Sequence, residues 1–87
     1  MAFAIILIMT LLVFLNATLR RHWPDYDAAA GISLEVEPGT LVSQVLPILG
    51  VPAQEVALLM VDGRRRELDF VLQGDERVAL FPPIGGG

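Results

Sequence analysis

The sequence predicts an α+β domain in which a mixed sheet of four to five strands carries one main helix across one face. Apolar stretches of strand length recur along the 87 residues, and one segment between them repeats its apolar residues at helical spacing. The elements follow the order strand, loop, strand, helix, strand, short strand, strand. Because the apolar stripe of a helix and the apolar face of a sheet must be buried against each other, two packed layers are expected.

The first fifteen residues carry no charge, and they are fewer than the ~20 apolar residues that a membrane-spanning helix needs. No basic residues precede this stretch and no small-residue cleavage site follows it, which disfavours a signal peptide. Its β-branched and bulky residues suit a buried strand that begins near Met9 or Thr10. Residues 1–8 would then be an apolar extension or a lengthened first strand. A membrane anchor and a native start at Met9 stay open as alternatives.

Residues 16–31 combine charges, proline and glycine, which predicts a surface loop with Trp23 and Tyr26 against the sheet edge. Ile32–Glu37 alternates apolar and polar residues, as a half-buried strand does. Thr40 is expected to cap the following helix. Pro47 predicts that this helix is short or kinked, and Gly50 is expected to end it. Its apolar stripe consists of Leu41, Val42, Val45, Leu46 and Leu49.

The second half predicts a hairpin and then the final strand. Val56–Val61 is a continuous apolar run, and Asp62-Gly63 is a strong two-residue hairpin signal. Arg64–Leu68 returns as a short exposed edge strand, whose charges discourage association between sheet edges. The alternative interpretation of its three arginines is a docking patch for an acidic partner or for ATP phosphates. The residues expected to pack inward after it are Leu68, Phe70, Val71 and Leu72.

The C-terminal stretch is the candidate site. Gly74-Asp75 is expected to turn the chain into the strand Val78–Phe81, and Pro82-Pro83 should end that strand and direct the tail away from the domain. Gly85–Gly87 form a strip of backbone without side chains, which fits a slot too narrow for other residues. The α-carboxylate of Gly87 is the reactive group on this strip.

Composition excludes several classes of function. There is no cysteine, so no disulfide or thiolate site can form, and a single histidine cannot build a metal site alone. The net charge of −4 and the lack of a dense basic stripe disfavour a nucleic-acid partner. No glycine-rich phosphate loop or Ser-His-Asp set is present, so the protein is expected to be a substrate and carrier rather than an enzyme. All six basic residues are arginine, so the chain has no lysine amine that an activated C-terminus could acylate.

The ending from Gly74 to Gly87, a turn and a strand followed by two prolines and terminal glycines, resembles MoaD and ThiS, the ubiquitin-like sulfur carriers. Phe81-Pro82-Pro83 makes MoaD the closer of the two. In layout the resemblance covers the chain from Met9 onward. It implies a β-grasp fold over residues 9–84 and a flexible glycine tail over residues 85–87.

The resemblance also implies a function. An adenylating enzyme related to ubiquitin activators would use ATP to adenylate Gly87, which follows Gly86, and a sulfur donor protein would supply the sulfur of a C-terminal thiocarboxylate. The large subunit of molybdopterin synthase would then receive this sulfur for molybdenum cofactor synthesis. The protein is expected to bind no cofactor itself, to be cytoplasmic and to act without a membrane partner. The residues expected to bind the partners are Phe81, Pro82, Pro83, Ile84 and Gly85.

Other functions stay open beside this one. The carrier could serve another pathway, such as the synthesis of the thiamine thiazole, a tungsten cofactor or an amino acid. A ubiquitin-like protein modifier would form the same adenylate but transfer Gly87 to a lysine of a target protein. A non-covalent β-grasp binding module would not need its glycine tail at all.

Overall fold

A computed structural model describes residues 7–84 of the chain, and within them the elements follow the predicted order. Two strands precede the helix, and a two-stranded hairpin and a final strand follow it. In chain order the elements are β1 (Met9–Leu15), the 3-10 helix η1 (Ala17–His22), β2 (Ile32–Val36), α1 (Val42–Leu49), the 3-10 turn η2 (Ala53–Glu55), β3 (Leu58–Val61), β4 (Arg64–Arg66) and β5 (Arg77–Phe81).

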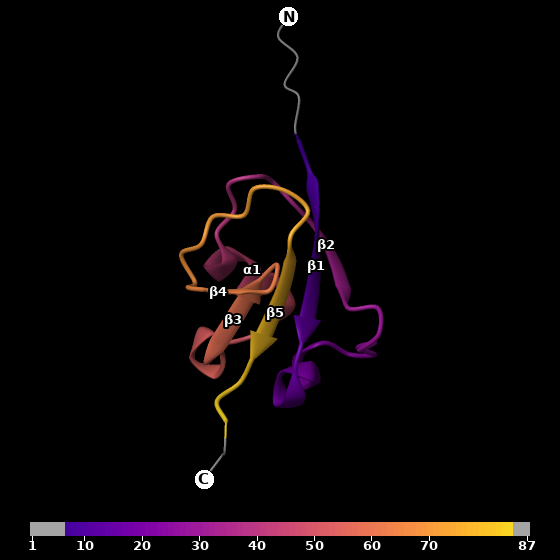
Figure 1. Ribbon diagram of the computed structural model, residues 1–87. Helices are drawn as coiled ribbons and strands as arrows, with labels where there is room; N and C mark the ends of the chain where they lie inside the picture. Colours follow the sequence, from indigo (N-terminus) through magenta and orange to yellow (C-terminus); the bar gives the residue numbers. More distant parts are fainter. Residues whose placement is uncertain (1–6, 85–87) are drawn as a thin grey trace, which may run out of the picture.

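The five strands form one mixed sheet in the order β2-β1-β5-β3-β4. The two central strands, β1 and β5, are parallel, while β1–β2, β3–β5 and β3–β4 are antiparallel. Helix α1 lies behind the sheet in Figure 1. The predicted α+β architecture is therefore confirmed, and β5 is the central strand from which the C-terminal tail leaves.

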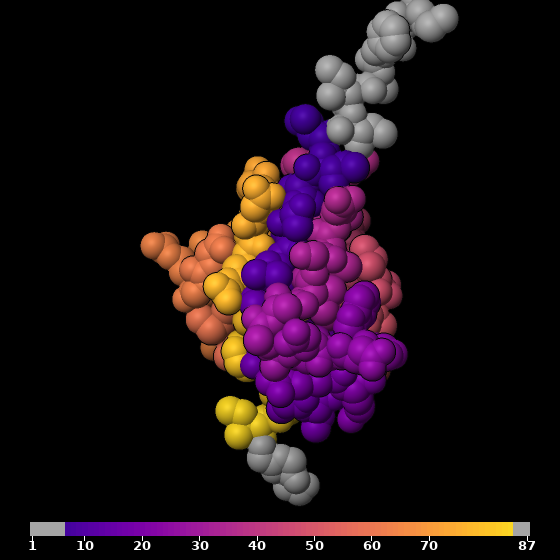
Figure 2. Space-filling model, turned by 90° about the vertical axis from the view of Figure 1, so that its right-hand side faces the viewer, coloured from indigo at the N-terminus to yellow at the C-terminus, as the bar shows by residue number. Residues whose placement is uncertain are grey.

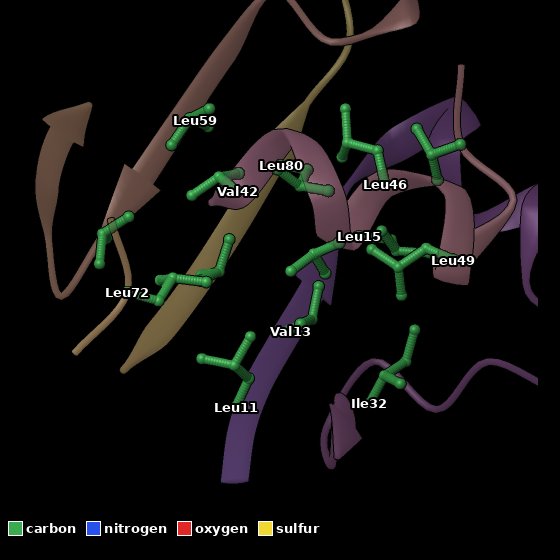
Figure 3. Close-up of a cluster of buried hydrophobic side chains, with 14 of the residues drawn as sticks. Leu11, Val13, Leu15, Ile32, Val42, Leu46, Leu49, Leu59, Leu72 and Leu80 are labelled. Carbon is green, nitrogen blue, oxygen red and sulfur yellow. The ribbon is translucent and has the colours of Figure 1, made fainter. Parts of the chain in front are cut away.

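The core lies between α1 and one face of the sheet (Figure 3). Alternate residues of each central strand point to the helix, because successive side chains of a strand face opposite sides. Burying each such leucine or valine contributes about 1.5–3 kcal/mol. The largest side chains with essentially no exposed surface are Leu11, Leu15, Leu19, Leu49, Leu72 and Leu80.

Helix α1 is short, as Pro47 predicts, and it ends at Gly50, whose φ of 73° is in the left-handed region. The prediction that Thr40 caps the helix is wrong. The N-cap position is Leu41, and Thr40 Oγ1 instead donates to the Glu37 carbonyl at 2.6 Å. Gln44 Oε1 accepts the Leu41 amide at 2.9 Å, and the next two amides, of Val42 and Ser43, donate to the carbonyls of Phe70 and Leu68.

The segment before β5 corrects a second prediction, because Val71 is exposed rather than packed inward. Val71 forms an isolated antiparallel bridge with Leu41, so this segment is locally extended. In an extended chain neighbouring side chains face opposite sides. Leu72 is therefore fully buried and Phe70 packs against the core, whereas Val71 between them faces solvent.

The N-terminal half agrees with its predictions in outline. Strand β1 begins at Met9, and Leu7 and Ile8 before it are exposed, while residues 1–6 lie outside the described part. Tyr26 packs against the core, and its hydroxyl accepts the Leu15 amide at 2.9 Å. In residues 7–84 no helix combines the length and the apolar character that a membrane crossing requires.

Candidate functional site

The root of the C-terminal tail is fixed on both sides by backbone hydrogen bonds. The Leu80 carbonyl accepts the Asn16 amide at 3.1 Å and the Asn16 side-chain amide at 3.0 Å. On the other side the Phe81 carbonyl accepts the Ala57 amide at 2.9 Å. Pro82 has no N–H, so the ladder ends there. The chain therefore leaves the sheet at a defined point, seen below β5 in Figure 1.

A groove of about 720 Å³ lies beside this root and is called the tail-root groove below. Its wall is mainly apolar and comes from four separate segments. Its side-chain polar groups are Asn16, whose amide is already bonded to the Leu80 carbonyl, and Arg65 of β4. The lining residues are Asn16, Ala17, Ala57, Leu58, Arg65, Phe81, Pro82, Pro83 and Ile84.

The tail-root groove continues into the face of the sheet that α1 does not cover, called the open sheet face below. The strand register places Phe14, Ala79 and Met60 side by side across three strands, and it places Leu58 beside Phe81. These side chains are half-buried, whereas their neighbours along each strand are buried on the helix side. The open sheet face consists of Leu12, Phe14, Leu58, Met60, Ala79 and Phe81. A contiguous apolar face of this kind is typical of an interaction surface.

Arginines surround this face. The Arg77 guanidinium lies 4.5 Å from the centroid of the Phe14 ring, a distance at which a cation and an aromatic face attract each other. Arg65 is paired with Met60 in the β3–β4 register, so it also belongs to the open sheet face. Within residues 7–84 Arg65 takes part in no ion pair. The face is thus apolar at its centre and carries Arg65 and Arg77 near β4 and β5, which suits an apolar partner surface with acidic groups on that side.

Two other basic residues are held in a cluster behind the groove. Arg21 Nη2 and His22 Nε2 lie 2.7 Å and 2.9 Å from Glu55 Oε1. The hydrogen bond from His22 is the main cause that lowers the pKa of Glu55, and the positive charge of Arg21 adds to it. This cluster joins η1 to η2, and Ala17 at the start of η1 lines the groove.

Nowhere in residues 7–84 do three histidine, cysteine, aspartate or glutamate side chains gather to hold a metal ion. In that part of the chain no buried side-chain nitrogen or oxygen lacks a hydrogen-bond partner either.

The structure places four of the predicted site residues around one groove. Phe81 and Pro82 are half-buried at its base, and Pro83 and Ile84 are exposed beyond it. The other predicted residues, Gly85, Gly86 and Gly87, lie outside the described part, so their role stays a prediction.

Sequence reasoning missed the rest of the groove wall. Asn16, Ala57 and Leu58 line the groove, and none of them was predicted as a site residue. Arg65 was predicted as a solvated edge residue with docking as the alternative. The sequence does contain a signal for Leu58. A strand with one solvated face alternates apolar and polar residues, whereas Val56–Val61 is apolar throughout, which indicates that its second face is also covered.

Comparisons with known proteins agree with this fold. A family model described as Mut7-C ubiquitin matches residues 9–85. The crystal structure of SAMP1 from Haloferax volcanii is similar at a TM-score of 0.67 and 17% identity, covering 90% of this chain and 99% of that chain. The solution structure of the Haloferax volcanii HVO 2177 protein has a TM-score of 0.67 and 21% identity, and the match covers 92% of this chain and 88% of that chain. A search of curated proteins found no match.

A further crystal structure, of Haloferax volcanii small archaeal modifier protein 1, has a TM-score of 0.67 and 16% identity. It covers 87% of this chain and 99% of that chain. At such identities these likenesses establish a shared fold, and the predicted β-grasp is confirmed.

Proposed function

The chain belongs to the Mut7-C ubiquitin family, which confirms its predicted ubiquitin-like relationship, and from this premise we propose that it is a sulfur carrier. In this proposal the carboxylate of Gly87 is adenylated and then converted to a thiocarboxylate. The protein is the substrate of these steps and not the catalyst.

The fixed root of the tail is the observation that carries the proposal. A carrier must deliver its terminal carboxylate to the active site of another protein while its body binds outside. Bonds from Asn16 and Ala57 hold the last residues of β5, so the position from which the tail departs is preset relative to the docking surface. Such preorganisation reduces the conformational entropy lost on binding.

The proposed reaction has two steps. An oxygen of the Gly87 carboxylate attacks the α-phosphorus of ATP, and pyrophosphate leaves. A sulfide equivalent from a sulfur donor protein then attacks the acyl carbon, and AMP leaves with the C–O bond electrons. The product is a thiocarboxylate, whose sulfur is a nucleophile. Because an acyl-adenylate has a far better leaving group than a carboxylate, the first step makes the second possible.

The open sheet face and the tail-root groove are proposed to bind the adenylating enzyme. A second partner that receives the sulfur must take in the same tail, so the two partners bind in succession. Phe81-Pro82-Pro83 favours the large subunit of molybdopterin synthase as that receiver and a role in molybdenum cofactor synthesis. The proposed place of these reactions is the cytoplasm.

The test is the mass of the protein isolated from its own cells without reducing agent, measured intact and on the C-terminal peptide. We expect one oxygen-to-sulfur exchange located at Gly87. A free carboxylate in cells that make the cofactor, together with no reaction between the purified protein, ATP and the native activating enzyme, would reject the carrier function.

The second candidate is a ubiquitin-like protein modifier, which the structural likeness to small archaeal modifier protein 1 favours. It would form the same adenylate but end in an amide bond to a target lysine. Conjugates that survive a denaturing gel would indicate this function. Because the chain has no lysine, its side chains offer no amine on which a chain of modifiers could grow.

A further inference from the structure

Strand β2 forms one edge of the sheet, and a second groove runs along it beside α1. This groove, called the edge groove below, has a volume of about 510 Å³. Figure 2 looks at the molecule from the β2 side, where the magenta strand lies at the surface. The lining residues are Glu35, Val36, Glu37, Pro38, Gly39, Thr40, Gln44 and Ile48.

The hydrogen-bond register shows which backbone groups of β2 are free. Leu12 donates its amide to the Glu76 carbonyl on the β5 side, so the odd-numbered residues of β1 face β2. Their partners in β2 are Ile32, Leu34 and Val36. Ser33 and Glu35 must then direct their N–H and C=O groups away from β1. Among the described residues no hydrogen bond reaches these groups.

The side chains around this edge have two different characters. Ile48 of α1 is 54% exposed and lines the edge groove, so the helix side offers an apolar contact. Ser33 and Glu35 are exposed and alternate with the inward residues of β2, which places them on the opposite face. Glu37 adds a second carboxylate next to the strand. Within residues 7–84 neither glutamate takes part in an ion pair.

These charges decide which occupant fits. A second copy of the chain, paired through β2, would bring its own acidic residues next to Glu35 and Glu37, and like charges across strands are destabilising. A segment with basic residues would instead place them beside these carboxylates. Backbone groups in a row and alternating side-chain contacts are the features of strand addition.

We propose that β2 accepts an added strand from a partner protein, an extended segment in which apolar residues alternate with arginine or lysine. The backbone of this segment pairs with Ser33 and Glu35. Its apolar side chains enter the edge groove at Ile48, and its basic side chains lie on the other face near Glu35. Neither the free strand edge nor its acidic residues are used by the tail.

The edge groove and the tail lie at opposite ends of the sheet. Val36 pairs with Met9 at the start of β1, whereas the tail leaves beside Leu80, which pairs with Leu15 at the end of β1. A strand bound at β2 therefore does not block the tail-root groove. The protein can hold one partner at β2 while another receives its tail.

The experiment titrates the isotope-labelled full chain with an end-capped octapeptide that alternates arginine and valine, and follows it by NMR. We expect saturable shifts of the Ser33 and Glu35 amides and of the Ile48 methyl groups. The same peptide with its four central residues N-methylated on the backbone should lose binding, because it lacks the central amides of the ladder in either strand direction and keeps its side chains. A peptide that alternates glutamate and valine should bind at least about tenfold more weakly.

Three variants test the surface itself. Glu35→Arg and Ile48→Gln change exposed side chains, so the fold is expected to persist, and each should weaken peptide binding about tenfold. Glu67→Arg makes the same charge change at an exposed site away from β2 and should leave the affinity unchanged. No saturable shift, shifts centred on the tail-root groove, self-association through β2, or equal affinities of all variants would each overturn the proposal.

Discussion

At the scale of single residues, Gly31 permits the contact between the loop and the open sheet face. Its φ is 71°, a region that residues with a side chain rarely adopt. A Cβ built there would lie 3.0 Å from Phe14 Cζ and 3.0 Å from the Val13 carbonyl oxygen. The ring could turn aside, but the backbone carbonyl lies in the central β1 and cannot move without distorting the sheet.

Gly31→Ala is therefore expected to lower the free energy of unfolding by about 1–3 kcal/mol, through backbone strain and the close contact. Urea denaturation followed by tryptophan fluorescence measures it, since Trp23 packs against the core. The matched control is Gly74→Ala, where no atom lies within 4 Å of an added Cβ. Equal losses in the two variants would show that the contact with Val13 and Phe14 is unimportant.

Neighbouring arginines of β4 allow a second prediction at this scale. Arg65 pairs with Met60 and lies on the open sheet face, while Arg64 pairs with Val61, whose side chain is buried on the helix side. If the open sheet face binds the activating enzyme, Arg65→Glu should slow association about tenfold at low salt. High salt should reduce the difference.

Arg64→Glu is the control, because it introduces the same charge one residue away on the other face. Stopped-flow association at two ionic strengths separates the two variants. A similar slowing by both would mean that the net charge of β4 matters and not the face on which the arginine lies.

At the scale of elements, the contacts of Glu55 join η1 to η2 and so hold the wall of the tail-root groove. The pKa of Glu55 is lowered mainly by the hydrogen bond from His22. A carboxylate accepts hydrogen bonds, so His22 Nε2 carries the shared hydrogen. Because the pKa is lower in the folded chain than the ordinary 4.5, ionised Glu55 stabilises the fold above that pH, and the contribution is lost as the pH falls through the folded pKa.

Glu55→Gln should remove this part of the pH dependence. The wild type is expected to lose stability below about pH 4.5 more steeply than the variant, while at neutral pH the variant is the less stable of the two. Urea unfolding at a series of pH values between neutral and acid tests this. Glu67→Gln, at an exposed position outside the cluster, should follow the wild-type curve.

The elements themselves were predictable where local chemistry determines them. Asp62-Gly63 forms the hairpin turn with φ values of 52° and 81°, and Gly50 ends the helix, as their residue types indicate. Thr40 was mispredicted because the amides that it could cap, those of Val42 and Ser43, donate to the carbonyls of Phe70 and Leu68, which are distant in the sequence. Val71 was mispredicted because an extended segment looks like a run of inward residues until its pairing with Leu41 is known.

At the scale of the whole molecule, the tail can be predicted from the sequence, but the surface that surrounds its root cannot. Pro82 and Pro83 are adjacent in the chain, so the point at which β5 ends is a local property. Asn16, Ala57 and Arg65 meet at the tail root only because β5 lies between β1 and β3. Local patterns do not specify this strand order, and so the groove could not be assembled from them.

In the proposed function the tail and the folded body have separable roles, which gives the last prediction. Ile84, the last residue that the structure describes, is fully exposed. Deletion of Gly86 and Gly87 should change the free energy of unfolding by less than about 0.5 kcal/mol. It should nevertheless abolish ATP–pyrophosphate exchange with the native activating enzyme, because the remaining carboxylate cannot reach the active site.

The complementary variant is Leu80→Ala, which keeps the tail but truncates a fully buried side chain of the central strand β5. It should lower the free energy of unfolding by about 2–5 kcal/mol. At a temperature where the variant remains folded, exchange should persist, because the carboxylate is intact. Normal exchange by the deletion variant would contradict this prediction, because the carboxylate of Gly85 would then be adenylated in place of that of Gly87. No exchange with the intact protein would instead favour a non-covalent module with the open sheet face as its binding site.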